Sequence, residues 1–176
     1  MKTVKTLIAI TILVVTAYAC KDGNSSEKTI VKNSATAATP MVNAYLEIKN
    51  GLVADSKEAT VKGANELITA FSSFDMTKLT GATHKTYMEI MENAKEHAGH
   101  IAKSDIDHQR KHFEGLSSTI NDLVALLGTE KTLYQDFCPM ANNNQGAYWL
   151  SEVKEIKNPY FGSRMLKCGS LKKQIN

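Results

Sequence analysis

Sulfur-bearing side chains are concentrated near the end of this sequence, in two short clusters. Cys138 and Met140 form one cluster, with the spacing Cys-Pro-Met, and Met165 and Cys168 form the other, with the spacing Met-Leu-Lys-Cys. Thiolate and thioether sulfurs are the ligands that select Cu(I) and similar soft ions, whereas zinc sites are built from cysteine and histidine and rarely include methionine. If the two clusters meet in the fold, these four residues are predicted to hold one soft metal ion.

The same two cysteines also suit a structural disulfide. Exported proteins normally oxidise a single pair of cysteines. A bridge between Cys138 and Cys168 would close a loop of about thirty residues and would stabilise the fold by roughly 3.5 kcal/mol in the chain-entropy treatment. Met140 and Met165 would then be ordinary core residues. The residues alone leave both interpretations open.

Imidazole groups form a second constellation. Four of the five histidines lie in pairs on either side of a predicted turn at residues 103–105, His97 with His100 and His108 with His112. Spacings of three and four residues put each pair on one face of a helix. If the two helices share the flank that carries the pairs, His100 comes level with His108, and His97 comes close to His112. If they share the other flank, the pairs point apart.

Neutral imidazole is the commonest transition-metal ligand, and copper, zinc and nickel all accept it. The four histidines are therefore candidate additional ligands of a metal site. In the structural alternative, His100 and His108 are solvated surface residues, while His97 and His112 border the core with ordinary hydrogen bonds. Neither pair has the specificity of a His-Glu-x-x-His zinc motif.

The first nineteen residues have the layout of a secretory signal. Lys2 and Lys5 precede an apolar run, and small residues lead up to Cys20. The run is too short for a permanent membrane helix. A cysteine directly after a small residue resembles the lipidation site of bacterial lipoproteins, so we expect cleavage before Cys20 and lipid attachment to it, with simple secretion as the alternative. The expected location is the cell envelope, with the lipid anchor in the periplasm or the outer membrane.

The charge of the chain argues against nucleic-acid binding. Removing Lys2 and Lys5 with the signal lowers the formal net charge from +3 to +1. A nucleic-acid footprint requires lysine and arginine clustered on one face, and the sequence contains no such cluster.

Residues 40–176 are predicted to form a single domain, after a polar, flexible tether over residues 20–39. Four amphipathic helices are expected: one beginning at Thr39-Pro40, one beginning at an Asp55–Glu58 capping box, one from about Thr83 to Lys103, and one capped by Ser104 with Asp107 and ending at Gly128. Short connections between long helices favour an antiparallel up-and-down four-helix bundle, so the fold class is mostly α.

Residues 133–138 and 147–150 are predicted to form a small C-terminal β-hairpin or irregular appendage that packs on the bundle through Trp149 and Tyr160.

Three stretches of the chain carry a resemblance to a known family. These are YLEIKNGLVADS, DIDHQRKHFEGLS and YQDFCPMANNNQGAYWLSEVKEIKNPYFGSRMLKCG, which together resemble the bacterial domain of unknown function 3347 family over about residues 40–169. Members of this family are lipoproteins and domains associated with the adaptor subunits of heavy-metal efflux pumps, mainly in Bacteroidetes. The resemblance implies a role in copper or silver homeostasis. It matches the family's Cys-Pro-Met-Ala and Met…Cys-Gly stretches to residues 138–141 and 165–169, and its helical histidines to His97, His100 and His108.

These features predict an envelope-anchored binding protein for a soft transition metal of the Cu(I) or Ag(I) class, acting in metal homeostasis or efflux support. The expected partners are the membrane, through the lipid anchor, and a component of a heavy-metal efflux system. We expect no enzyme activity, because the sequence shows no base, orienting acid or oxyanion motif to accompany the Cys138 thiol. The alternative is a disulfide-stapled structural or protein-interaction module of a periplasmic lipoprotein that binds no metal.

Overall fold

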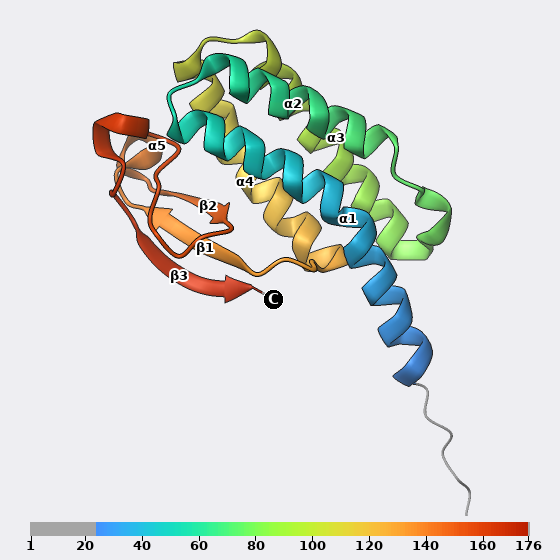
Figure 1. Cartoon of the computed structure of the whole chain (residues 1–176). Coiled ribbons are helices and arrows are strands. Elements are labelled where there is room, and N and C mark those ends of the chain that lie inside the picture. Colours follow the sequence, from blue (N-terminus) through green and yellow to red (C-terminus); the bar gives the residue numbers. More distant parts are fainter. Residues whose placement is uncertain (1–23, 176) are drawn as a thin grey trace, which may run out of the picture.

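Four long helices and a small antiparallel sheet make up the computed structural model, which describes residues 24–175 and the side chains of residues 36–175. The helices are α1 (Asn24–Val53), α2 (Lys57–Ser72), α3 (Gly81–Lys103) and α4 (Ile106–Leu127). Each helix packs against the next in the sequence, and α1 also packs against α4, which closes the bundle (Figure 1). The prediction of a mostly helical bundle is therefore confirmed.

The core lies between the helices and is built from the apolar faces that the sequence periodicity indicates. Tyr45 of α1 stacks on Phe113 of α4 with ring centroids 5.3 Å apart. The hydroxyl group of Tyr45 lies 2.8 Å from the Ser117 hydroxyl and accepts a hydrogen bond from the Leu150 N–H at 3.0 Å. Since Leu150 belongs to the appendage, one buried tyrosine ties two helices to the sheet.

The start of α1 differs from the prediction. The helix begins at Asn24, and Pro40 lies inside it. A proline inside a helix removes one backbone hydrogen bond. Ala38 and Met41 on either side of it are fully buried, so packing holds the helix together at this point. The expected tether over residues 20–39 thus overlaps the helix from Asn24 onwards, and Thr39-Pro40 is not its N-terminus.

Two helix caps also differ from the predicted residues. Ser56 caps α2, and its side chain accepts a hydrogen bond from the Ala59 N–H at 3.2 Å. Asp105 caps α4 in the same way, through the His108 N–H at 3.0 Å. The predicted caps make other contacts: Asp55 turns towards the appendage, and Ser104 donates to a carbonyl at the end of α3. The predicted end of α4 at Gly128 is confirmed, because this residue is its C-cap with φ 78°.

The appendage contains three strands in the order β2-β1-β3, one more than the predicted hairpin. These are β1 (Leu133–Cys138), β2 (Ala147–Ser151) and β3 (Ser170–Ile175), with α5 (Ala141–Asn144) between the first two and η2 (Gly162–Met165) before the third. Trp149 is 1% exposed and meets Tyr160 edge to face at 6.0 Å, and the Tyr160 ring lies 5.7 Å from that of Phe113 on α4. The predicted docking through Trp149 and Tyr160 is therefore confirmed.

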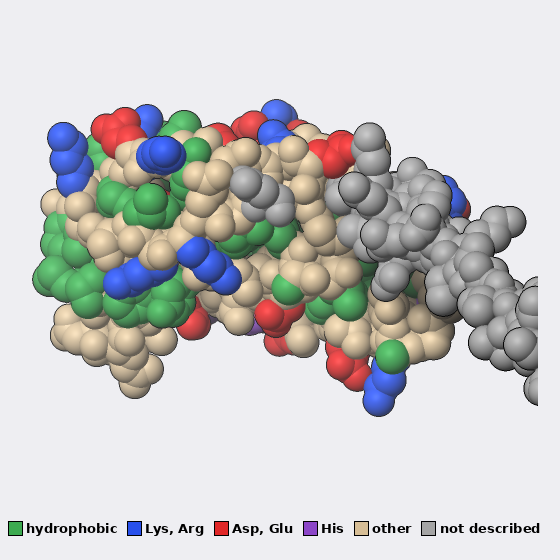
Figure 2. All heavy atoms as spheres, turned by 90° about the horizontal axis from the view of Figure 1, so that it is seen from below, with side chains coloured by type: hydrophobic (Ala, Val, Ile, Leu, Met, Phe, Trp, Pro, Cys, Tyr) green, Lys and Arg blue, Asp and Glu red, His purple; other side chains and the backbone are tan. Residues whose placement is uncertain are grey.

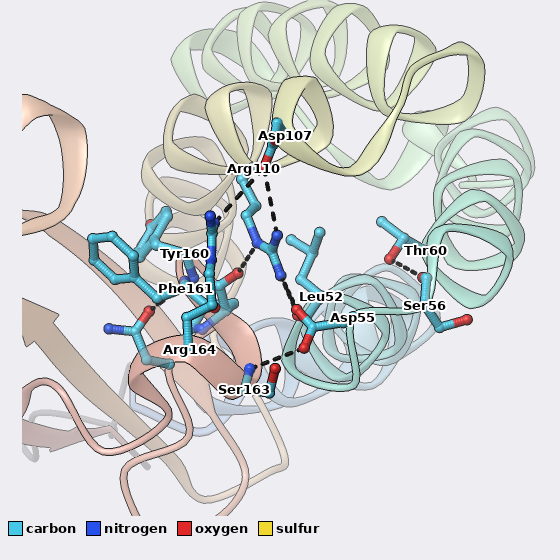
Figure 3. A network of polar contacts seen from close by, with 12 residues as sticks. Leu52, Asp55, Ser56, Thr60, Asp107, Arg110, Tyr160, Phe161, Ser163 and Arg164 are labelled. Carbon is cyan, nitrogen blue, oxygen red and sulfur yellow. Dashed lines mark hydrogen bonds and ion pairs between the residues drawn. The ribbon is translucent and has the colours of Figure 1, made fainter.

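A buried arginine fastens the appendage to the bundle (Figure 3). The guanidinium group of Arg110 on α4 donates to the Leu52 carbonyl and to the Pro159 carbonyl, each at 3.1 Å, and to the Asp55 carboxylate at 2.5 Å. Asp55 also accepts from the Ser163 N–H at 3.0 Å. Hydrogen bonds from Ser163, together with the Arg110 charge, lower the pKa of Asp55 to about 2. We call these five residues the latch, because they join α1, α4 and the loop around η2.

The sheet end of the molecule exposes apolar and basic side chains together, as the view from below shows (Figure 2). Tyr148, Val153 and Leu171 are 50%, 38% and 43% exposed. Lys172 lies over the Phe137 ring at 5.1 Å. Among the residues that the structure describes, no helix combines the length and apolar character needed to cross a bilayer.

Candidate metal centre

The four histidines of α3 and α4 form a single cluster beside the turn that joins these helices. Nδ1 of His97 lies 3.3 Å from Nδ1 of His112, and Nε2 of His112 lies 3.0 Å from Nε2 of His108. The rings of His100 and His112 are nearly parallel, at 4° and 4.2 Å between centroids, and those of His100 and His108 are 6.1 Å apart. The two helices therefore share the flank that carries the histidines, and the predicted pairs meet.

Three of these histidines lie close enough together to be candidate ligands of one metal ion. One ring nitrogen from each of His100, His108 and His112 lies within 4.8 Å of the other two. Nitrogen ligands bind Zn(II) at about 2.0–2.1 Å, so the donor atoms of one ion lie about 3–3.5 Å apart. Small side-chain rotations would close the remaining gap, because His100 and His108 are exposed and His112 is half-buried. The site opens to solvent.

Electrostatics favours the neutral form of His112 at the centre of the cluster. Partial burial, followed by the nearby His100, His108 and His97, lowers the pKa of His112. Neutral imidazole is the form that ligates metal ions. Bringing four imidazoles together is unfavourable when they are protonated, and a bound cation would use the lone pairs that they present when neutral.

The two cysteines are also brought together, at the junction of β1 and β3. Their Sγ atoms lie 2.9 Å apart, with Cys138 buried and Cys168 half-buried, and both are free thiols in this structure. The hydrogen bond with Cys138, together with burial, raises the pKa of Cys168 to about 11. Two thiols at this distance could be bridged by oxidation, or could lose their protons and bind one soft ion.

The two methionines lie in the segments next to the cysteines, Met140 after β1 and Met165 at the end of η2. Met140 is 49% exposed and lines a cleft of about 620 Å³ with residues of α4, α5 and η2. Met165 is half-buried, and its carbonyl accepts a hydrogen bond from the Cys168 N–H at 3.0 Å. Within residues 36–175, no hydrogen bond joins either thioether to the cysteines, and none joins the histidines to the cysteines. The contacts thus join the histidines to one another and the cysteines to one another.

Two residues with unusual surroundings, Gly115 and Asp136, were not singled out from the sequence. Gly115 of α4 faces His97, and a Cβ built on it would overlap the imidazole ring. A lone glycine in a helix interior is a signal that could have pointed to this close approach. Asp136 is fully buried with neither carboxylate oxygen hydrogen-bonded, and no sequence signal marks it. Cys20, the predicted lipidation site, lies outside the described residues.

The fold and the site together define a helical-bundle protein with a solvent-open histidine cluster. The sequence model of a family described as a protein of unknown function, DUF3347, matches residues 41–132. The chain belongs to this family. The matched range contains all four clustered histidines and ends before β1 and the cysteine pair, so it is shorter than the resemblance over residues 40–169 suggests. No curated protein and no solved structure gave a significant match.

Proposed function

We propose that this protein binds a transition-metal ion at the cell envelope and serves metal homeostasis or efflux support. The observation that carries the proposal is the convergence of His100, His108 and His112, whose ring nitrogens lie within 4.8 Å of one another. Protonated imidazoles repel one another, whereas neutral imidazoles this close together can share one metal ion through their lone pairs. Binding of one shared metal ion would account for the convergence of the three histidines.

The histidine cluster and the cysteine pair suit different metal ions, because their donor atoms differ. Three imidazoles suit borderline divalent ions such as Cu(II), Zn(II) and Ni(II). A soft ion such as Cu(I) or Ag(I) would instead prefer the sulfurs of Cys138 and Cys168, which lie 2.9 Å apart, with Met140 or Met165 joining them after a rearrangement. The cysteine pair is therefore the second candidate site, and it is the one on which a role in soft-metal handling depends.

The proposed location at the envelope rests on the N-terminal signal and the lipidation of Cys20 that the sequence predicts, and a lipid anchor would hold the bundle near its membrane. We propose a binding role without catalysis. If the cysteine pair is a stable disulfide and the histidines bind nothing, the protein is instead a structural or interaction module of the envelope.

A metal titration of the chain without residues 1–20 tests the proposal. Cu(II), Zn(II) and Ni(II) are titrated against a competing chelator, and Cu(I) is titrated anaerobically with a reductant. We expect the His100→Ala, His108→Ala, His112→Ala triple variant to lose the divalent site. His84→Ala is the matched control, because His84 is an exposed histidine of the same helix that lies outside the cluster.

The two candidate sites are separated by a second variant. Cys138→Ser, Cys168→Ser should lose Cu(I) binding and keep the divalent site. If the triple histidine variant binds divalent ions as tightly as the parent, the histidine site is wrong. If the double cysteine variant keeps Cu(I), or if the parent holds a bridge that resists mild reductant and takes up no copper, the soft-metal site is wrong.

A further inference from the structure

His112 is the centre of the histidine cluster, and its two ring nitrogens face different neighbours. Nδ1 lies 3.3 Å from Nδ1 of His97, and Nε2 lies 3.0 Å from Nε2 of His108. The two nitrogens of an imidazole point towards opposite sides of the ring. An ion shared with His108 and His100 therefore lies on the Nε2 side of His112, and His97 lies on the other side.

The position of His97 has a chemical consequence for the proton on His112. An imidazole that binds a metal through Nε2 carries its proton on Nδ1, and that N–H needs an acceptor that fixes the tautomer and the ring orientation. Nδ1 of His97 is the atom in place to accept it. His97 must then carry its own proton on Nε2, the atom that lies against α4 at Gly115.

We propose that His97 is a positioning residue of the metal site, which accepts a hydrogen bond from the Nδ1–H of His112 and so presents Nε2 of His112 to the ion without binding the ion itself. This inference rests on the proposed function. It assigns the four histidines two different roles: His100, His108 and His112 bind, and His97 orients.

Gly115 provides the space that this arrangement needs. A Cβ at this position would overlap Nε2 and Cε1 of the His97 ring, so any other residue would displace the ring from His112. Glycine lowers helix stability, and nothing about its backbone in the middle of α4 requires it. The close approach of His97 explains why this position has no side chain.

The test uses the Cu(II)-loaded protein and two readouts: the affinity from chelator competition, and the number of bound imidazoles from pulsed electron paramagnetic resonance. The variants are His97→Ala, His97→Gln and Gly115→Ala, with His84→Ala as the control. We expect the parent and His97→Ala to show the same number of bound imidazoles. The affinity of His97→Ala should fall about 10- to 100-fold, the usual effect of losing a group that orients a ligand.

Rescue separates positioning from a general loss of structure. The side-chain oxygen of glutamine can accept the hydrogen bond from His112, so His97→Gln should recover most of the affinity, whereas Gly115→Ala should resemble His97→Ala. A drop of one bound imidazole in His97→Ala would show that His97 is a ligand and would overturn the inference. Unchanged affinity in His97→Ala, or no recovery with glutamine, would also overturn it.

The proposed function and this inference fail in different ways. If the parent binds none of Cu(II), Zn(II) and Ni(II), the proposed histidine site and this inference are both wrong. If the parent binds and only the His97 variants behave unexpectedly, the metal site stands and the positioning role does not. Circular dichroism of the metal-free variants shows whether each one folds, and the comparison of His97→Ala with His97→Gln decides the question even if Gly115→Ala does not fold.

Discussion

Asp136 should make the stability of this protein fall as the pH rises. The residue is 0% exposed, and neither of its carboxylate oxygens has a hydrogen-bond partner. Burial raises its pKa to about 7, and the charge of Lys49 on α1 opposes that rise. Lys49 is itself paired with Glu152 at 3.2 Å, so it only partly compensates an ionised Asp136.

The size and sign of the effect follow from linkage. An unfolded aspartate has a pKa near 3.8, so the folded state keeps a proton between about pH 4 and pH 7 that the unfolded state has released. Each unit of pKa difference corresponds to about 1.4 kcal/mol, so the rise from 3.8 to about 7 gives about 4 kcal/mol as the full effect, and we expect about 2–4 kcal/mol over the pH range that can be measured. This stabilisation is complete below pH 4 and is lost as the pH rises through 7.

Asp136→Asn removes the charge and keeps the shape. Urea unfolding of parent and variant is measured at pH 4.5, 6 and 8, and the difference in unfolding free energy at each pH cancels the other titrating groups. The difference should shift by about 2–4 kcal/mol in favour of the variant between the lowest and highest pH. Asp122→Asn on the exposed face of α4 is the control. A pH-independent difference would refute the reasoning, and would mean that Asp136 finds partners when it ionises.

Three further predictions concern the latch and the cysteine pair. Arg110→Met leaves the buried Pro159 carbonyl without its donor and removes one donor each from the Leu52 carbonyl and the Asp55 carboxylate, so it should lower the unfolding free energy by about 1–3 kcal/mol; an unchanged urea midpoint would contradict this. Gly162→Ala places a Cβ against Asp55 and Arg110 at a residue with φ +56°, so thermal melting should show a loss of at least about 1–2 kcal/mol. Because its pKa is raised to about 11, the Cys168 thiol of the reduced parent should react with a disulfide reagent at pH 7.5 about tenfold more slowly than free cysteine. The rate is measured in the parent and in the Cys138→Ser variant. Removing Cys138 should restore the rate, and equal rates in the two proteins would show that the pair does not suppress the thiolate.

Most of the helical fold could be predicted because burial follows a helical period. The exceptions have local causes. The start of α1 was misplaced because Pro40 suggests a first helical residue, whereas packing of Ala38 and Met41 carries the helix through it. Strand β3 was missed because its side chains are almost all exposed and show no apolar alternation. It is held by backbone pairing with β1, which leaves no mark on the pattern of side chains.

The candidate site was only partly predictable for related reasons. Spacing placed each histidine pair on a helix face, but which flanks meet depends on how the whole bundle packs. The inward position of Asp136 was hidden by a register shift between Gln135 and Asp136, which breaks the simple alternation of β1. The role of Gly115 depends on the position of a ring from another helix. In each case the missing information is a contact between elements, which one-dimensional periodicity does not contain.

The two candidate metal sites depend on different parts of the fold. The histidine cluster needs only the packing of α3 on α4, and both helices lie within the range of residues 41–132 that the family model matches. The cysteine pair needs β1 and β3 to be paired, outside that range. Weakening the latch, as in Gly162→Ala, loosens the second arrangement without touching the histidines. Divalent-metal binding should therefore survive a change that impairs Cu(I) binding. If Gly162→Ala weakened divalent-metal binding and Cu(I) binding together, the histidines and the cysteines would have to belong to one site. Such a site would require the appendage to close on the bundle, which the present arrangement does not show.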